Sequence, residues 1–289
     1  MKKIDLHLHL SFDSVPKSDT LLVSTYKEML PHLEELGIGK GVLMSSGERN
    51  FSMPMGSNEE NCRIAAADPE HYAWMCNLDY DGNSETVYDR LSACKEKGAV
   101  GIGKLMINRR LDDPFLNAVF EAAGKLNLPV TFHMSPETGY SYGVVDDPGL
   151  PLLEACLKRH PHTQFLGHSQ TFWIEMSADA PTDKESRNQW GKGPVIPGGR
   201  VPELFRKYPN LYGDLSANSA GCAIMRDPAF GLEFLETYAD RLFFATDMVN
   251  TKMVFPLGQW LDEQAANGAL SRQAYEKICF KNAQSVFGL

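Results

Sequence analysis

Two histidines near the start of the chain have the spacing of metal ligands. His7 and His9 alternate with three leucines in the segment KIDLHLHL. This alternation predicts a β-strand, on which the two imidazoles point to the same face, roughly 7 Å apart. Such a pair is half of a metal site. An edge strand with a solvated histidine face would show the same pattern, so further ligands must come from elsewhere in the chain.

Three more polar residues lie near the ends of apolar runs. His133 lies in PVTFHMS, His168 in TQFLGHS and Asp247 in RLFFATD. A single histidine at such a place is commonly a hydrogen-bonded structural residue, and a single aspartate can cap the following helix. The coincidence of these residues with His7 and His9 favours a shared site instead. Histidine and carboxylate ligands with an open coordination position suit a catalytic Zn²⁺ or a similar divalent ion.

Strands and helices that alternate along the chain must position these residues. We predict strands at residues 3–10, 41–46, 72–79, 100–106, 129–135, 163–169, 211–217 and 241–247. We predict helices at 19–37, 57–68, 84–97, 114–126, 150–159, 200–207, 228–239, 256–266 and 271–286. Eight strand–helix units indicate class α/β and a closed (β/α)₈ TIM barrel, whose reacting groups lie at the C-terminal ends of the strands. The histidines and Asp247 fall at those ends.

The length and the motifs limit the other arrangements. A chain of 289 residues is compatible with a single barrel domain over residues 1–289. A doubly wound sheet is the alternative fold, but no glycine-rich dinucleotide motif follows the first strand. A long polar loop at residues 170–199 follows the sixth strand, and we expect it to be an active-site lid. Its aromatic residues could also form a dimer contact.

Composition limits the partners. The net charge is −9 and no basic run is present, which argues against nucleic acid. No apolar window is long enough for a membrane span, and the first residues lack the features of a signal peptide. The six cysteines are scattered, as expected of free thiols in a reducing cytoplasm. We therefore expect a cytoplasmic protein that acts on a small molecule.

Four motifs, in this order, resemble the amidohydrolase superfamily: DLHLH, FHMS, GHS and ATD. With its ending KICFKNAQSVFGL, the chain is most similar to the amidohydrolase-2 group, which holds aminocarboxymuconate-semialdehyde decarboxylase, related aromatic-acid decarboxylases and lactone hydrolases. The resemblance implies that His168 is catalytic, acting on the metal-bound water or the substrate. It implies one divalent ion, Zn²⁺ in the first place and Mn²⁺ as the alternative, and a homodimer by analogy. The implied metal ligands are His7, His9, His133 and Asp247.

Lys104 leaves the number of metal ions open. It lies among apolar residues in VGIGKLM on the fourth strand. In some members of the superfamily a lysine on this strand is carbamylated and bridges a second metal; otherwise Lys104 reaches solvent or substrate. Three further residues are candidates for substrate binding. Arg109 could bind a carboxylate through a forked contact or lie on the surface, Asp214 could hydrogen-bond to a ligand or to substrate, and Trp173 belongs to the expected lid.

Three functions are compatible with these residues. The first is a metal-dependent hydrolase of a small cyclic ester or amide, in which Asp247 is catalytic and accepts the proton of a metal-activated water. The second is a metal-dependent non-oxidative decarboxylase of a small aromatic or unsaturated acid. The third, a non-catalytic binding protein, is disfavoured because every ligand position carries a competent residue. Loop arginines close to the metal would favour the decarboxylase. We expect the hydrolase, as the broader class.

Overall fold

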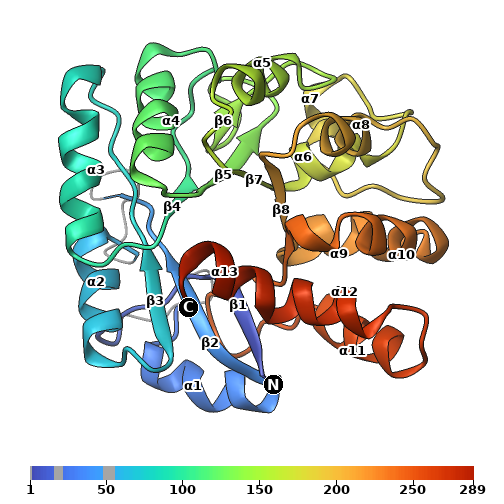
Figure 1. Cartoon of the computed structure of the whole chain (residues 1–289), viewed down its shortest axis with the longest axis horizontal. Helices are drawn as coiled ribbons and strands as arrows, with labels where there is room; N and C mark the ends of the chain where they lie inside the picture. Colours follow the sequence, from blue (N-terminus) through green and yellow to red (C-terminus); the bar gives the residue numbers. More distant parts are fainter. Residues whose placement is uncertain (1, 16–21, 48–55) are drawn as a thin grey trace.

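Parallel strands form the centre of the molecule. The computed structural model describes residues 2–15, 22–47 and 56–289 (Figure 1). The strands pair in chain order, and all of these pairs are parallel. They are β1 (Lys3–Leu8), β2 (Ile38–Met44), β3 (Tyr72–Met75), β4 (Ile102–Leu105), β5 (Val130–Ser135), β7 (Phe165–His168), β8 (Leu211–Asp214) and β9 (Leu242–Phe243). The short strand β6 (Val144–Val145) pairs with the end of β5.

Two sets of backbone contacts close these strands into a barrel. Between β3 and β4, Cys76 and Ile102 form a bridge, and the amide of Cys76 donates to the carbonyl of Gly101 at 2.9 Å. Between β9 and β1, Leu8 forms a bridge with Met248, and the amide of Asp247 donates to the carbonyl of His7 at 2.8 Å. These contacts confirm the predicted eight-stranded TIM barrel.

Helices follow the strands and lie around them (Figure 1). The helices that sequence periodicity predicted are α1 (Tyr26–Glu35), α2 (Asn58–Ala67), α3 (Val87–Glu96), α4 (Pro114–Leu126), α5 (Pro151–Arg159), α8 (Arg200–Lys207), α10 (Pro228–Thr237) and α11 (Leu257–Ala266), followed by α12 (Arg272–Glu276) and α13 (Asn282–Phe287). A π-helical turn, Lys277–Lys281, joins the last two. No helix among the described residues is both long and apolar enough to span a bilayer.

Three expectations about helices need correction. Helix α1 does not begin at residue 19, which lies outside the described residues; Thr25 caps it and forms a capping box with Glu28. Helix α9 (Ala217–Met225) was not predicted, because its small residues and glycine give a weak helical pattern. The segment 170–199 is not wholly irregular, since it contains α6 (Gln170–Trp173) and α7 (Lys184–Arg187).

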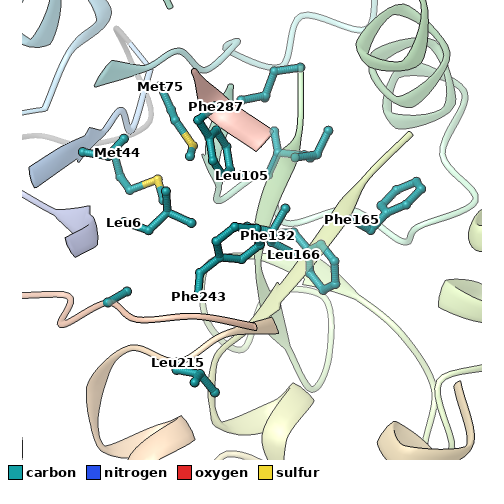
Figure 2. Packing of buried hydrophobic residues seen from close by; sticks show 14 of the residues in the cluster. Leu6, Met44, Met75, Leu105, Phe132, Phe165, Leu166, Leu215, Phe243 and Phe287 are labelled. Atoms are coloured by element: carbon teal, nitrogen blue, oxygen red, sulfur yellow. The ribbon is translucent and has the colours of Figure 1, made fainter. Parts of the chain in front are cut away.

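A single apolar core surrounds the strands. Buried side chains from several strands pack together in Figure 2. They include Leu6, Met44, Met75, Leu105, Phe132, Leu166 and Phe243. Close packing of this kind resists small shifts of the backbone, so the residues at the ends of the strands are held in fixed positions.

Candidate metal centre

Three donor atoms converge where β1 and the segment after β9 meet. Nε2 of His7 lies 3.1 Å from Nε2 of His9 and 3.1 Å from Oδ1 of Asp247. Nε2 of His9 lies 3.2 Å from the same carboxylate oxygen. Ligand atoms that surround a zinc ion at about 2.1 Å are roughly 3–3.5 Å apart. The three side chains therefore have the spacing of one coordination site.

Two further histidines complete the cluster. The ring centre of His168 lies 4.7 Å from that of His7 and 5.2 Å from that of His133. Among the described residues, Nδ1 of His133 is buried and has no hydrogen-bond partner. A buried ring nitrogen without a partner is costly, and a bound cation would satisfy a lone pair there. The donor set and this nitrogen both fit a divalent ion.

His168 lies close to the other donor atoms of the cluster. One donor atom each from His7, His168 and Asp247 lie within 4.8 Å of one another, and Nε2 of His168 is 3.6 Å from Oδ2 of Asp247. The structure thus brings together all five residues that the sequence singled out.

Asp214 contacts the His7 ring at Nδ1, on the side opposite Asp247. Its Oδ2 lies 2.6 Å from Nδ1 of His7, and both side chains are fully buried. Nδ1 therefore donates a hydrogen bond to the carboxylate, and Nε2 faces His9 and Asp247. Carboxylates that hold a ligand histidine in this way fix its orientation and increase its basicity. Asp214 supports the cluster through His7 and does not line the cavity described below.

Asp5 connects β1 to the segment after β9 through hydrogen bonds. One of its carboxylate oxygens accepts hydrogen bonds from the amides of His7 at 3.0 Å and Thr246 at 2.9 Å. The other accepts from the Thr246 hydroxyl at 2.6 Å. Burial raises the pKa of Asp5 to about 7. Sequence reasoning assigned Asp5 no role, although its alternation with His7 and His9 placed it on the same face.

The pKa values of four of the five cluster residues suit metal ligation, whereas His7 carries a second ring proton that a bound ion would have to displace. Burial would raise the pKa of Asp247, but Lys104 and His7 hold it well below its usual range, so the group is a carboxylate. Burial and Lys104 lower the pKa of His9 to about 4, so its imidazole is neutral. Burial lowers the pKa of His7, yet Asp247 and Asp214 outweigh it and raise the value to about 9. Burial holds the pKa values of His133 and His168 well below the usual range.

Lys104 lies beside the cluster as an ammonium. Its Nζ is 3.2 Å from Oδ1 of Asp247 and 5.8 Å from the ring centre of Tyr142. Burial lowers the pKa of Lys104, but the nearby Asp247 and Tyr142 outweigh this effect, so the pKa lies above its usual value. The side chain is only 5% exposed. Lys104 therefore reaches Asp247 and the cavity rather than bulk solvent.

Unusual backbone geometry accompanies the site residues. Asp247 itself has a φ of 60°, Ser169 after His168 has 95°, and Ala217 after Ser216 has 57°. Side chains other than glycine rarely adopt positive φ, and such strain concentrates at functional sites. Ser169 also exchanges two hydrogen bonds of 3.1 Å with the backbone of Met134, next to His133. The strand ends are thus shaped to aim these side chains.

A cavity of about 210 Å³ opens onto the cluster. Its walls are largely apolar, and its polar groups come mainly from His9, Asp247 and Lys104. The lining residues are His9, Ser46, Lys104, Met106, Tyr142, Asp247, Val249 and Met253. Tyr142 was not predicted; its only sequence signal is an aromatic residue in the loop after the fifth strand. A cavity of this size and character suits a small, mainly apolar molecule.

Two of the expected substrate-binding residues lie elsewhere. The Arg109 guanidinium is exposed and lies over the ring of Tyr80, 4.6 Å from its centre. Trp173 is buried against Phe172, and its indole N–H donates to the carbonyl of Asp214 at 3.3 Å. Neither residue lines the cavity. Apolar packing holds Trp173 in the core, and the ring of Tyr80 holds Arg109 at the surface.

A closed parallel barrel with histidine and aspartate donors at the C-terminal ends of its strands defines the class of metal-dependent TIM-barrel enzymes. The family model for Amidohydrolase (Amidohydro_2) matches residues 4–289. This chain therefore belongs to the amidohydrolase family, as the motifs of the sequence indicated. The family accommodates both the hydrolase and the decarboxylase expectations, and the donor cluster supports a divalent metal ion.

Solved structures with the same fold carry both activities in their names. The 2,6-dihydroxybenzoate decarboxylase from Rhizobium has 16% identity and a TM-score of 0.62, over 99% of this chain and 98% of that one. A dihydroxybenzoic acid decarboxylase from Polaromonas sp. JS666, with bound manganese, has 17% identity and a TM-score of 0.60, over 100% and 97%. A probable 2-pyrone-4,6-dicarboxylic acid hydrolase from Acinetobacter baumannii has 13% identity and a TM-score of 0.58, over the full length of both. No curated protein matches this chain in sequence.

Proposed function

We propose that this chain is a metal-dependent hydrolase of a small cyclic ester, a cyclic amide or a related substrate. The observation that carries the proposal is the convergence of His7 Nε2, His9 Nε2 and Asp247 Oδ1 within 3.1–3.2 Å of one another. These atoms lie beside a small cavity at the catalytic end of the barrel. A cytoplasmic location is part of the proposal, supported by six cysteines that form no disulfide.

The chain's own residues have distinct tasks in this proposal. His7, His9, His133 and Asp247 hold one divalent ion, which when bound supplies Lewis acidity to a substrate carbonyl and to water. Asp247 lines the cavity, so its carboxylate can accept a proton from the attacking water and deliver it to the leaving group. Apolar side chains such as Met106 and Met253 line the cavity beside these polar groups.

We propose a single ion, with zinc as the first candidate. The ammonium of Lys104 lies 3.2 Å from Asp247, where its charge opposes a second cation. Manganese is the alternative, supported by the manganese bound in the structurally similar decarboxylase from Polaromonas. Carbamylation of Lys104 would reverse its charge and remove the objection to a second ion.

A decarboxylase is the second candidate, because of Lys104. It is the one cationic side chain among the described residues that line the cavity, and it could bind a substrate carboxylate. Arg109 and Arg110 do not supply such a clamp, since the first lies over Tyr80 and the second pairs with Asp147 at 3.0 Å. The absence of an arginine clamp in the described lining keeps the hydrolase first.

Metal content and two parallel assays test the proposal. Metal-free protein is reconstituted with zinc or manganese, and ions per chain are measured for wild type, His9→Ala and the control His71→Ala. His71 pairs with Asp68 at 2.9 Å, away from the cluster. We expect about one ion per chain, lost only in His9→Ala. Small lactones and cyclic amides are tested for hydrolysis, and aromatic acids for release of CO₂.

The outcomes separate the candidates. Hydrolysis that depends on the ion supports the proposal, and CO₂ release without hydrolysis moves the assignment to a carboxy-lyase. Failure to bind either ion after reconstitution would overturn both. About two ions per chain, reduced to one by Lys104→Ala, would contradict the single-ion site.

A further inference from the structure

His168 has a buried hydroxyl as its inner neighbour. Oγ of Ser216 lies 2.8 Å from Nδ1 of His168. Ser216 is fully buried, and His168 is 1% exposed. Water therefore does not compete for this contact, and the position of its proton is determined by the protein. The opposite ring nitrogen, Nε2, lies 3.6 Å from Oδ2 of Asp247, which lines the cavity.

The hydrogen bonds around Ser216 indicate which atom donates. The hydroxyl has one other close partner, Nδ1 of His7 at 3.3 Å. That nitrogen lies 2.6 Å from Oδ2 of Asp214, a contact in which the nitrogen donates to the carboxylate. Its proton is already in use, and it has no lone pair for Ser216. Among the described residues, Nδ1 of His168 is therefore the acceptor left for the hydroxyl proton.

The alternative arrangement leaves a buried donor unsatisfied. If Nδ1 of His168 carried a proton, it would donate to Ser216, because Oδ2 of Asp214 lies 3.9 Å away, too far for a hydrogen bond. The O–H of Ser216 would then have no acceptor among the described residues. A buried donor without a partner loses its hydrogen bonds to water and gains none in the protein, which disfavours this arrangement. Both the imidazolium and the tautomer protonated on Nδ1 share this defect. Only the ring protonated on Nε2 alone satisfies both residues.

The local backbone also directs the hydroxyl toward His168. Ser216 is the N-cap residue of α9, yet its side chain makes no capping hydrogen bond. Serine at this position commonly bonds to the helix it precedes. Here the amide of Ser216 donates to Oδ1 of Asp214 at 3.0 Å, and Ala217 adopts a φ of 57°. The Ser216 hydroxyl therefore contacts His168 instead of capping α9, and the backbone at Ala217 is strained.

We propose that Ser216 is a positioning residue that holds His168 in the tautomer with its proton on Nε2. His168 is then a hydrogen-bond donor directed toward Asp247 and the reacting atoms, and it is not a metal ligand, since a protonated nitrogen has no lone pair to offer. An N–H at this place can stabilise negative charge that develops on a substrate oxygen. This use of the proton rests on the proposed function, whereas the position of the proton does not.

Nitrogen-detected NMR of the histidine rings tests the proposal without any substrate. Protein with ¹⁵N-labelled histidine is measured metal-free and zinc-loaded, and His168→Asn identifies the signals of His168. We expect a protonated Nε2 and an unprotonated Nδ1 in wild type. Ser216→Ala should shift the ring toward the other tautomer, and Ser216→Thr, which keeps the hydroxyl, should restore it. Ser11→Ala removes another fully buried serine hydroxyl, whose partner is the carbonyl of Ser24, and should leave the signals unchanged.

Zinc titration supplies a second readout. If His168 is not a ligand, His168→Asn changes zinc affinity by less than about threefold, whereas His9→Ala lowers it more than about tenfold. A proton on Nδ1 in wild type would overturn the proposal, as would an unchanged tautomer in Ser216→Ala. The wild-type spectrum decides the tautomer even if a variant does not fold. Absence of hydrolysis with the expected tautomer would reject the proposed function alone.

Discussion

His7 is held by carboxylates at both ends of its ring. Asp214 lies 2.6 Å from Nδ1 and Asp247 lies 3.1 Å from Nε2. Asp214 fixes the direction of Nε2, while Asp247 offers a donor atom of its own. An asparagine at position 214 would keep the size of the side chain but lose the charge. The two aspartates should therefore contribute to metal affinity by different routes.

We predict that Asp214→Asn lowers metal affinity by about 10–100-fold, because His7 loses the partner that orients it and increases its basicity. Calorimetric titration of metal-free protein with zinc measures the change. Asp262→Asn is the control, since this carboxylate pairs with Lys3 at 2.7 Å and contacts no residue of the cluster. Equal affinities for Asp214→Asn and wild type would show that Asp214 does not orient the ligand.

Gly143 precedes β6 and lies against His133, so the return of the chain after β5 leaves no room for a side chain. A Cβ atom there would lie 2.5 Å from the carbonyl oxygen of His133 and 2.9 Å from its Cδ2. The residue also has a φ of 108°. We predict that Gly143→Ala destabilises the fold by about 1–3 kcal/mol and lowers metal affinity, because the histidine is displaced.

Urea unfolding and zinc titration measure the two effects. Gly139→Ala is a matched control, since Gly139 also has a positive φ, of 81°, but has no atom within 4 Å of the added carbon. Both variants should lose stability through backbone strain. A loss of metal affinity in Gly139→Ala as large as that in Gly143→Ala would contradict the steric explanation.

A buried carboxylate that precedes α5 in the chain binds the amides of its first turn. Asp146 accepts hydrogen bonds from the amides of Leu152 at 3.0 Å and Leu153 at 2.7 Å. Burial raises its pKa from 3.8 to about 6 despite these bonds. The folded state therefore binds this proton more tightly than the unfolded state, and its contribution to stability is lost as pH rises from about 4 to about 6.

We predict a decrease of at most about 3 kcal/mol over this pH range from Asp146, and a smaller decrease in Asp146→Asn. Urea unfolding at several pH values measures the slope. Asp147→Asn is the control, because Asp147 is exposed and pairs with Arg110, which lowers its pKa. If Asp146→Asn and wild type have the same slope, other groups cause the pH dependence.

The proposed metal ligands join parts of the chain that are far apart in sequence. His7 and His9 come from the first strand and its end, His133 from the fifth, and Asp247 follows the last. Because β9 and β1 are neighbours that close the barrel, an ion held between them should stabilise the whole fold. An ion that binds only the folded state stabilises it by about 2.7 kcal/mol at a free concentration of about 100 Kd.

For a domain of this size, we predict that saturating zinc raises the Tm by roughly 5–10 °C. Thermal unfolding with and without the ion measures the shift, and His9→Ala should remove most of it. His71→Ala should keep it. A shift of the same size in His9→Ala would place the stabilising ion outside the cluster.

The barrel and the members of the site were accessible from local sequence patterns. Alternation in KIDLHLHL and the apolar runs that end at His133, His168 and Asp247 were enough to predict the strands and the end of the barrel at which these residues meet. Helix α9 was missed because its small residues give no strong period. The start of α1 was wrong because the capping box at Thr25, rather than periodicity, sets it.

By itself, the sequence determined the fold class and the residues that can ligate a metal, since periodicity and side-chain chemistry are local properties, and its four motifs carried the resemblance to the family. Only the tertiary structure decided which atoms face one another. His7 and Asp214 are 207 positions apart in the chain yet form a hydrogen bond. Lys104 reaches Asp247, whereas Arg109 turns to Tyr80. Such pairings depend on strand register and barrel closure, which bring distant residues within hydrogen-bond distance and which no local pattern encodes.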